Sequence, residues 1–538
     1  MTLLTLKNLR IAYAISNTQP SSEISWAVDD VSFSVEKGEV LALVGESGCG
    51  KSTIGKAIMK LLPRDTVIEG DILFEGESTL NYNYQQLRRF RGEAVGLIFQ
   101  DPMTRLDPLM TIGDHCLETL QAHQPQLSRQ RAKEKVLITL ETVKIPPERF
   151  GQYPHEFSGG MRQRVAIALA LLLEPKLIIA DEPTTSLDVT ISNQILGELT
   201  TLCRDRNMGL LLISHDLHMV GRYGDRIGVM YGGKVVEMGR VRDVMNNPSH
   251  EYSKVLLNSV LHPQDKADIN ELSTNKKVLL QLKDLKQHYT LETNFLEQLL
   301  GKKAEIIKAV DNINLELYEG EIFGLVGESG CGKSTLSRTI LQLIKPTSGQ
   351  VKFQEKDISI LTSKNMIKIR RQIQMIFQDP HACLNPLMTV GNAIAEPLLI
   401  HNLGDKQQIR QKVEQMLIKV GLTPIEEYYH RYPKELSGGQ QQRVAIARAL
   451  ITNPKLVICD EPVSMLDATV QAQVLELMLE LKNEFNLTYL FITHDLNVAR
   501  YMCDRIAVMN QGKIVELNTT ENIFINPQND YTKILIQA

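Results

Sequence analysis

One nine-residue stretch, Gly-Glu-Ser-Gly-Cys-Gly-Lys-Ser-Thr, occurs at residues 45–53 and again, unchanged, at residues 327–335. Both copies fit the pattern G-x-x-x-x-G-K-[ST], in which glycines let the backbone turn tightly and aim successive N–H groups at phosphate oxygens. The helix expected after each stretch adds its positive N-terminal end to the same anion site. The chemistry that this pattern predicts is the binding of a chain of phosphates.

The residue types within the two stretches predict individual roles. We expect Lys51 and Lys333 to reach the terminal phosphates, and the hydroxyls of Ser52 and Ser334 to hold Mg²⁺. The other expected phosphate-binding positions are Gly45, Ser47, Gly48, Gly50 and Thr53 in the first copy, and Gly327, Ser329, Gly330, Gly332 and Thr335 in the second. Chance glycine-rich turns are the alternative, which two identical matches in the same context disfavour.

A cysteine lies inside each stretch, at Cys49 and Cys331. One interpretation is that the position needs only a small side chain. The other is that a thiol beside a helix N-terminus and a lysine has a lowered pKa and a reactive thiolate. Alkylation would then block the phosphate site, and a bound phosphate ligand would protect it.

The elements that must position these residues are indicated by apolar runs. Residues 40–44 and 322–326 precede the two stretches and are expected to be buried strands. Further strands are expected at 3–13, 70–74, 95–99, 177–182 and 210–213, with helical sequence over 111–150 (including 129–143) and after Ser158. Strands that alternate with helices predict α/β domains with a mainly parallel sheet.

The whole order of segments repeats. Gln100 recurs as Gln378, Ser158 as Ser437, Asp181 as Asp460 and His215 as His494, always 278 or 279 residues later. So constant an offset predicts a duplicated domain of about 250 residues rather than a solenoid of short repeats. We predict a first domain over 1–260, a polar linker over 261–277 and a second domain over 278–538.

Composition sets the broad class of protein. A chain of 538 residues is too long for one core, and 43% hydrophobic with 23% charged residues is ordinary for a soluble globular protein. A formal charge of −4 gives no sign of a nucleic-acid partner. There is no apolar run of about 18 residues and no basic leader, so neither a membrane span nor a signal peptide is expected. Seven scattered cysteines predict a reduced, cytosolic protein.

Two acidic residues close an apolar run in each half of the chain. These pairs are Asp181–Glu182 and Asp460–Glu461. The aspartates are expected to hold Mg²⁺, and a glutamate at a strand end beside a terminal phosphate is positioned to polarise an attacking water as a general base. Buried carboxylates of this kind can instead be structural N-caps.

A Ser-Gly-Gly sequence lies shortly before each acidic strand, at 157–161 (Phe-Ser-Gly-Gly-Met) and 436–440 (Leu-Ser-Gly-Gly-Gln). Alone, it would be a helix N-cap with glycines. In register with the phosphate loops and acidic pairs, it makes essentially the whole chain resemble the ATP-binding subunits of ATP-binding cassette (ABC) transporters. The resemblance implies ATP hydrolysis by two tandem P-loop domains, each with a RecA-like, mainly parallel core, an antiparallel β subdomain and a helical subdomain.

The resemblance also implies roles for particular residues. The signature residues would contact the γ-phosphate held by the opposite phosphate loop, which implies head-to-tail pairing of the two domains; they are Ser158, Gly159 and Gly160, and Ser437, Gly438, Gly439 and Gln440. His215 and His494 would contact the γ-phosphate and help to order the water. Gln100 and Gln378 would coordinate Mg²⁺ or that water.

Other matches and departures complete the resemblance. Tyr13 and Tyr289 stand where an aromatic ring stacks on adenine, with Trp26 a rival in the first half. Residues 186–188 and 465–467 match a loop that crosses the dimer interface in the family. Met161 replaces the usual signature glutamine, although the peptide-transporter branch commonly has Ser-Gly-Gly-Met there. Met465 and Ala468 alter the neighbourhood of the second interface loop, but no catalytic group is lost. Both sites are therefore expected to hydrolyse ATP.

The branch of the family is indicated by residues 153–164 (Tyr-Pro-His-Glu-Phe-Ser-Gly-Gly-Met-Arg-Gln-Arg) and by the tails at 248–252 and 527–531, which resemble dipeptide, oligopeptide and nickel importers. The fused arrangement is most similar to the Yej-type importers of microcin C and peptides, then to glutathione importers. This implies two integral-membrane permease subunits, an indirect extracytoplasmic solute-binding protein and peripheral attachment to the cytoplasmic face of the inner membrane. No iron–sulfur cluster is expected, because the cysteine cluster of some relatives is not in the sequence.

Two other functions compete with import. A soluble twin-cassette ATPase acting on ribosomes would have a long charged linker between its cassettes, whereas the expected linker here is short. A DNA-damage recognition ATPase would need zinc-binding cysteines and large insertions. The sequence does not name the solute, because its specificity is set by the permease and the binding protein.

Overall fold

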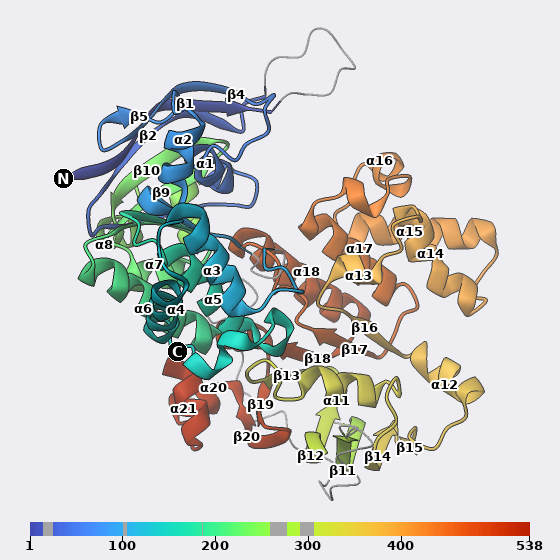
Figure 1. Ribbon diagram of the computed structural model, residues 1–538. Coiled ribbons are helices and arrows are strands. Elements are labelled where there is room, and N and C mark those ends of the chain that lie inside the picture. Colours follow the sequence, from blue (N-terminus) through green and yellow to red (C-terminus); the bar gives the residue numbers. More distant parts are fainter. Residues whose placement is uncertain (14–24, 101–104, 185–186, 259–276, 291–305, 538) are drawn as a thin grey trace, which may run out of the picture. The chain divides into compact units, whose positions relative to one another are not determined.

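The computed structural model describes residues 1–13, 25–100, 105–184, 187–258, 277–290 and 306–537. The chain divides into two compact units, Met1–Val260 and Leu261–Ala538, and each is described by itself (Figure 1). The predicted linker lies outside the described residues apart from Lys277. Its bounds stay a prediction.

The main sheet of the first unit has six strands in the order β10-β9-β3-β8-β7-β6. All are parallel except β10, which pairs antiparallel with β9. Helices cover both faces, so every residue of β3, β7 and β8 is buried. The strands are β3 (Val40–Val44), β6 (Val95–Ile98), β7 (Leu177–Asp181), β8 (Gly209–Ile213), β9 (Arg226–Tyr231) and β10 (Lys234–Arg240).

A second, antiparallel sheet has the order β2-β1-β4-β5. Its strands are β1 (Thr2–Ala12), β2 (Val28–Glu36), β4 (Val67–Phe74) and β5 (Glu77–Ser78). Leu4 and Val31 from this sheet share one buried cluster with Leu41 of β3 and Ile54 of α1 (Lys51–Ile58). The two sheets of the unit therefore enclose α1, the helix that follows the phosphate loop.

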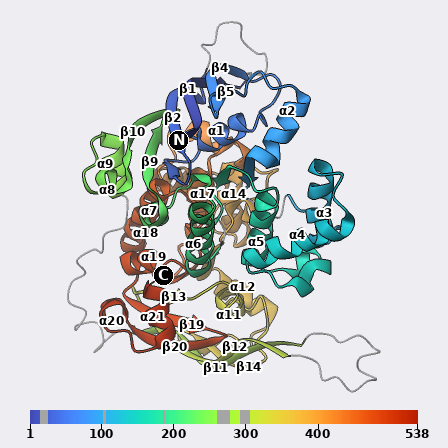
Figure 2. The same ribbon diagram turned by 60° about the vertical axis from the view of Figure 1, so that its left-hand side comes forward.

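The helices of the first unit include a layer beside the main sheet, in which α3 and α4 pack against α5 (Figure 2). The hydroxyls of Thr111 and Ser128 cap α3 and α4 by accepting backbone N–H bonds. The helices after α1 are α2 (Tyr84–Arg89), α3 (Ile112–His123), α4 (Arg129–Thr142), α5 (Gly159–Leu171), α6 (Val189–Asp205), α7 (Leu217–Tyr223), α8 (Val241–Asn246) and α9 (Glu251–Asn258).

The second unit repeats this architecture. Its main sheet has the order β16-β17-β18-β13-β19-β20 and its antiparallel sheet the order β12-β11-β14-β15. The strands are β11 (Val278–Thr290), β12 (Ile306–Tyr318), β13 (Ile322–Val326), β14 (Ser348–Phe353), β15 (Lys356–Asp357), β16 (Ile373–Ile376), β17 (Leu456–Asp460), β18 (Thr488–Thr493), β19 (Arg505–Asn510) and β20 (Lys513–Thr519).

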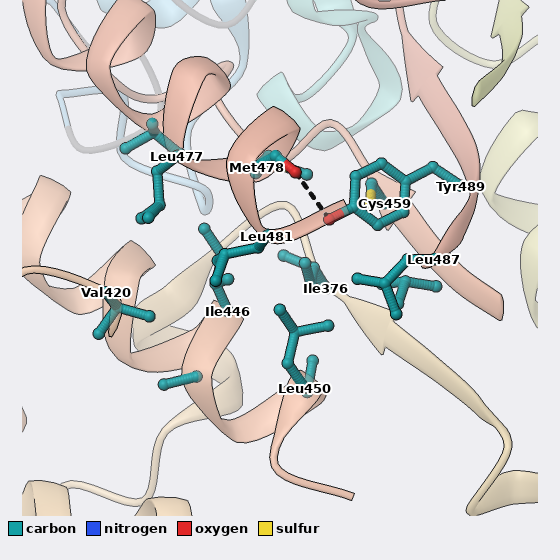
Figure 3. Packing of buried hydrophobic residues seen from close by; sticks show 14 of the residues in the cluster. Ile376, Val420, Ile446, Leu450, Cys459, Leu477, Met478, Leu481, Leu487 and Tyr489 are labelled. Atoms are coloured by element: carbon teal, nitrogen blue, oxygen red, sulfur yellow. Dashed lines mark hydrogen bonds between the residues drawn. The ribbon is translucent and has the colours of Figure 1, made fainter. Parts of the chain in front are cut away.

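The helices of the second unit pack on a core that contains the buried Tyr489, whose hydroxyl donates to Met478 O at 3.0 Å (Figure 3). The bond satisfies the only polar atom of that ring. The helices are α11 (Lys333–Ile340), α12 (Ser363–Arg370), α13 (Pro380–Cys383), α14 (Val390–Ile400), α15 (Lys406–Lys419), α16 (Ile425–Tyr429), α17 (Gly438–Leu450), α18 (Ala468–Phe485), α19 (Leu496–Met502), α20 (Thr520–Ile525) and α21 (Asp530–Gln537).

The predicted fold class is confirmed: two tandem α/β units, each with a mainly parallel core, an antiparallel β sheet and a helical layer. The strands predicted at 40–44 and 322–326 have those bounds. The strand predicted over 177–182 ends at Asp181, because Glu182 turns into the left-handed region at φ 47°. Within the described part of the chain, no helix is long and apolar enough to cross a membrane.

Candidate active site

Four polar segments meet at one edge of the main sheet. The phosphate loop follows β3, Gln100 follows β6, Asp181 ends β7, and His215 follows β8. These strands are parallel neighbours, so their carboxyl ends lie at the same edge, where α/β sheets bind ligands. The second unit brings the corresponding segments together in the same way.

The phosphate loops require glycine at two positions. Gly45 has φ 148°, and a Cβ there would lie 2.2 Å from Met230 O. Gly50, the N-cap of α1, has φ 104°, and its Cβ would lie 2.5 Å from Ala27 O. The second loop is built alike, since a Cβ on Gly327 would lie 2.2 Å from Met509 O. At these positions the loop packs directly against neighbouring backbone in a left-handed conformation, so only glycine fits without a clash.

The loop lysines are buried and point back across their own loops. Lys51 Nζ donates to Gly45 O at 2.7 Å and to Glu46 O at 2.8 Å. Lys333 Nζ makes the same two bonds in the second loop, at 2.6 and 3.0 Å. Each ammonium group is therefore held where the N-terminal end of the following helix already favours an anion.

A hydroxyl and a carboxylate meet beside each lysine. Ser52 Oγ donates to Asp181 Oδ1 at 2.7 Å, and Ser334 Oγ to Asp460 Oδ1 at 3.2 Å. Burial raises the pKa of both aspartates, although the serine hydrogen bonds oppose the shift. A divalent cation would offset this unfavourable burial of negative charge, and these oxygens are ligands that Mg²⁺ prefers. The donor set therefore fits Mg²⁺, whose presence remains a proposal.

Glu182 lies between the glutamine and the histidine. Gln100 Nε2 donates to Glu182 Oε2 at 2.7 Å, and His215 Nδ1 lies 3.4 Å from Glu182 Oε1. Burial is the largest single influence and lowers the pKa of His215, but the hydrogen bond with Glu182 and the negative charges of Glu182 and Asp216 together outweigh it, so the net pKa is raised. The glutamate thus faces an imidazole that is readily protonated near neutral pH.

Glu461 has the same partners in the second unit. Gln378 Nε2 donates to its Oε2 at 3.0 Å, and His494 Nδ1 lies 3.1 Å from the same oxygen. Burial is the largest single influence and raises the pKa of Glu461, but the hydrogen bond and charge of His494 and the charge of Lys333 together outweigh it, so the net pKa is lowered and the carboxylate is favoured. Among the described helices, those that follow the two glutamates have Asp188 and Asp467 as N-caps, which disfavours the alternative that the glutamates are structural N-caps.

Both glutamates have left-handed backbones, with φ 47° at Glu182 and φ 48° at Glu461. Residues other than glycine adopt this region rarely, and such strain is concentrated at functional sites. Other equivalent pairs, such as Glu174 and Asn453, share this conformation, so it helps to aim the two glutamate side chains while their catalytic role stays a prediction.

The signature serines cap helices within their own units. Ser158 Oγ accepts the N–H of Met161 at 3.4 Å, and Ser437 Oγ accepts that of Gln440 at 3.3 Å. A Cβ on Gly160 would lie 2.8 Å from Ile191 Cγ2, so close helix packing also requires glycine there. Contact between each signature and the opposite phosphate loop stays a prediction, as do the roles of Gly159, Gly438 and Gly439.

The proposed adenine contacts are supported unequally. The Tyr13 hydroxyl lies 3.2 Å from Thr53 Oγ1, which places its ring beside α1, and 41% of the residue is exposed. Tyr289 is similarly exposed at the end of β11. Trp26 precedes Ala27, whose carbonyl faces Gly50. Trp26, the alternative to Tyr13 as the adenine contact, therefore also lies near the phosphate loop. Ser186, in the loop predicted to cross the interface, lies outside the described residues.

The interpretation of Cys49 as a thiol of lowered pKa is wrong. Burial raises its pKa even though Lys51 Nζ lies 3.7 Å from Sγ and opposes the shift. The sulfur lies 3.0 Å from where a Cβ on Gly45 would be, so space is tight. The interpretation that this position needs a small side chain is favoured, and Cys331 is buried in the same way.

One pair of contacts to the loops was missed from the sequence. Tyr252 on α9 accepts the N–H of Glu46 at 3.1 Å, and Tyr531 on α21 accepts that of Glu328 at 3.2 Å. Their helices are held by a carboxylate, since Glu237 accepts the backbone N–H groups before α9. Burial raises the pKa of Glu237, but hydrogen bonds from Ser253 and Ser249 lower it to about 2. The sequence contains one indication of these contacts, because a tyrosine occurs at the same place in both tails, as Tyr252 and Tyr531.

Comparisons with known proteins agree with this geometry. The family model described as ABC transporter matches residues 28–185 and 310–464, and the model for the oligopeptide/dipeptide transporter C-terminal region matches residues 236–286. The chain is 41% identical to the glutathione import ATP-binding protein GsiA of Pectobacterium atrosepticum, covering 95% of this chain and 86% of the relative.

Two further relatives are similar over their whole length. The chain is 42% identical to the peptidoglycan transport ATP-binding protein YejF of Agrobacterium fabrum, covering 100% of this chain and 96% of that protein. It is 41% identical to an ABC transporter ATP-binding protein, YejF, of Escherichia coli K12, covering 99% of both. Nothing in these comparisons supports action on ribosomes. The chain therefore belongs to the oligopeptide and dipeptide branch of the ABC transporter family, as an ATP-binding protein with two ATP-hydrolysing domains.

Proposed function

We propose that this chain energises the import of peptides or peptide-like solutes by hydrolysing Mg-ATP at two sites. The observation that carries the proposal is the glutamate held between a glutamine and a histidine beside a phosphate loop, built twice in the chain. The relatives named for glutathione and peptidoglycan transport support a peptide-like solute.

The phosphates are held by the loop. The backbone N–H groups, the α1 N-terminus and Lys51 bind and orient them, as the corresponding groups of α11 and Lys333 do in the second cassette. Ser52 and Asp181 would hold Mg²⁺, and Gln100 is a further candidate. When bound, Mg²⁺ supplies charge neutralisation of the phosphates. Tyr13 and Tyr289 are proposed to stack on the adenines.

The attacking water is positioned by Glu182 or Glu461. The carboxylate accepts a hydrogen bond from water and takes its proton as the water oxygen bonds to the γ-phosphorus. The bond between that phosphorus and the bridging oxygen of ADP breaks at the same time, so the products are ADP and inorganic phosphate. The glutamine amide fixes one carboxylate oxygen of Glu182, and His215 contacts the other. In this arrangement the histidine orients the base and can itself donate to a phosphate oxygen.

The two cassettes are proposed to pair head-to-tail, so that each nucleotide lies between one phosphate loop and the other signature. Ser437 and the N-terminus of α17 would then complete the site of Lys51, and Ser158 and α5 the site of Lys333. The permeases, to which an extracytoplasmic binding protein delivers the solute, would anchor the chain at the cytoplasmic face of the inner membrane. No nucleic acid is involved.

The test is complementation in the source organism. We expect loss of the gene to abolish uptake of labelled di- and oligopeptides, the wild-type gene to restore it, and Glu182→Gln with Glu461→Gln to fail although the protein is present at the same level. Uptake of a free amino acid by its own carrier is the control. Unchanged peptide uptake in the deletion strain would contradict the proposed solute class.

A further inference from the structure

A pocket of about 550 Å³ in the second unit is lined mainly by basic side chains. The lining residues are Lys368, Arg371, Gln372, His401, Asn453 and Lys455. Arg371 and Gln372 precede β16, and Lys455 precedes β17. These are the amino-terminal ends of parallel strands, so the pocket lies at the opposite edge of the sheet from the candidate active site.

The basic side chains of this pocket are not paired with carboxylates in the part of the chain that the structure describes. Among the residues that the structure describes, Lys368, Arg371 and Lys455 have no ion-pair partner within 4.0 Å. The amides of Gln372 and Asn453 add neutral hydrogen-bond donors to the lining. Like charges that share a small volume repel one another, so an anion bound among them is stabilised.

The corresponding place in the first unit is identified by its backbone. Lys455 N donates to Gln372 O at 2.9 Å, as Lys176 N donates to Ala94 O at 2.9 Å. Asn453 and its counterpart Glu174 both have left-handed backbones, with φ 53° and 55°. The two places are therefore equivalent in the duplicated fold.

Carboxylates neutralise the cations of the first unit. Glu75 lies 2.6 Å from Lys176, Glu93 lies 3.2 Å from His123, and Glu174 lies 3.5 Å from Lys135. The second unit keeps the lysine and the histidine, as Lys455 and His401, but has Gln354, Arg371 and Asn453 at the positions of the three glutamates. Every carboxylate of the set is thus replaced by a neutral or basic residue.

The environment of His401 reflects this replacement. Burial lowers the pKa of His401, and the charge of Arg371 lowers it further. In the first unit the equivalent histidine instead lies beside Glu93. The sign of the charge that faces the imidazole has therefore been reversed between the two cassettes.

We propose that this pocket binds a small anion that bears a phosphate group. Arginine offers a planar fork of donors to phosphate oxygens, lysine offers a point charge, and the pocket volume suits a small ligand. Either a soluble polyphosphate compound or the headgroup of an anionic phospholipid would supply this chemistry. The site lies beyond the proposed transport function and does not depend on it.

The test measures the pKa of His401 by NMR in the full-length protein labelled with ¹³C-histidine. A His401→Gln variant identifies the His401 resonance. The probes are inorganic tripolyphosphate and vesicles of phosphatidylglycerol, with phosphatidylcholine vesicles as the neutral control. We expect a saturable change that raises the pKa of His401 by about one unit, because an anion favours the imidazolium. A response to tripolyphosphate indicates a soluble ligand, and a response to phosphatidylglycerol vesicles alone indicates a headgroup.

The variant Arg371→Glu with Asn453→Glu gives the second unit two of the carboxylates of the first. We expect its His401 pKa to be raised without any probe and to respond no further. Lys533→Glu with Gln537→Glu on α21 makes the same change in net charge and should keep the response. Arg371→Gln, a milder variant, should weaken it. No saturable response to either anionic probe, or an equal response in Arg371→Glu/Asn453→Glu, would overturn the proposal.

Discussion

At the scale of single residues, the two glutamates that follow β7 and β17 combine backbone strain with fixed side-chain partners. We expect Glu182→Gln with Glu461→Gln to bind ATP with near-normal affinity, because the phosphate loops are untouched. Hydrolysis should fall by about 10²- to 10⁴-fold, since an amide cannot take the proton from water. Equilibrium binding and phosphate release measure the two properties separately. Hydrolysis at the wild-type rate would contradict the assignment.

The pKa of the loop thiol Cys49 is shifted in the direction opposite to the one that the sequence suggested, so we expect slow and not rapid modification. Because burial raises the pKa of Cys49 above the ordinary value for a thiol, the fraction of thiolate at neutral pH is low. We expect slow modification by a maleimide at pH 7 and full ATP hydrolysis in Cys49→Ser with Cys331→Ser. Cys383, which is only half-buried, is the control for accessible thiols. Rapid inactivation that ATP prevents, and that the double serine variant escapes, would restore the interpretation of a reactive thiolate.

This error shows what the sequence reveals and what it does not. The sequence places Lys51 two residues from Cys49, and so predicts the direction of the charge effect. It does not reveal burial, which outweighs that effect. Likewise, the bond between Glu46 and Tyr252 joins residues 206 apart, and a tyrosine in a tail helix has no local pattern that indicates such a partner.

At the scale of elements, the sequence was more informative. The strands at 40–44 and 322–326 could be predicted because a short, continuous apolar run before a glycine-rich loop has few other structures open to it. Their parallel order then brings Gln100, Asp181 and His215 to one edge. What remained beyond prediction was which side chains contact one another there, since this depends on the strained turn at Glu182.

The signature helices differ in one stabilising feature. Ser437 and Gln440 form a reciprocal capping box, in which Gln440 Oε1 accepts the Ser437 N–H at 3.0 Å. Met161 cannot make this bond at the start of α5. We expect Met161→Gln to stabilise the first cassette by about 0.5–1 kcal/mol, and Gln440→Met to destabilise the second by a similar amount. Calorimetric unfolding of the full chain measures both, and a lower unfolding temperature for Met161→Gln would contradict the argument.

The glutamines connect the catalytic carboxylates to the segments that lead into the helical layers. Gln378 precedes α13 and α14 and contacts Glu461 at the same time. If these segments report nucleotide state to the permease, Gln100→Ala with Gln378→Ala should reduce solute transport more than it reduces ATP hydrolysis in detergent. His215→Ala with His494→Ala is the matched control, because these residues contact the same glutamates from other strands. Equal losses in both assays for the glutamine variant would indicate a purely catalytic role.

At the scale of the whole molecule, duplication gives the chain two complete sets of ATP-site residues whose surroundings have diverged. The loops, acids, glutamines and histidines are the same in both units, whereas the signature position 161/440 and the basic pocket are not. Most residues proposed to act on ATP thus occur in both units, whereas position 161/440 and the residues of the basic pocket differ between them. The pairing of the two cassettes decides whether these differences act on one nucleotide or on both.

Head-to-tail pairing can be tested by combining substitutions, because it assigns Lys51 and Ser437 to one nucleotide and Lys51 and Ser158 to different ones. In a background of Glu182→Gln with Glu461→Gln, which retains ATP, Lys51→Ala with Ser437→Arg should disable one site and leave the other able to occlude nucleotide. Lys51→Ala with Ser158→Arg should disable both. The pairs carry the same kinds of substitution, so any difference in occluded ATP reports the pairing and not the severity of the changes. If Lys51→Ala with Ser158→Arg were the pair that still occluded ATP, each site would be built within a single cassette and the head-to-tail arrangement would be wrong.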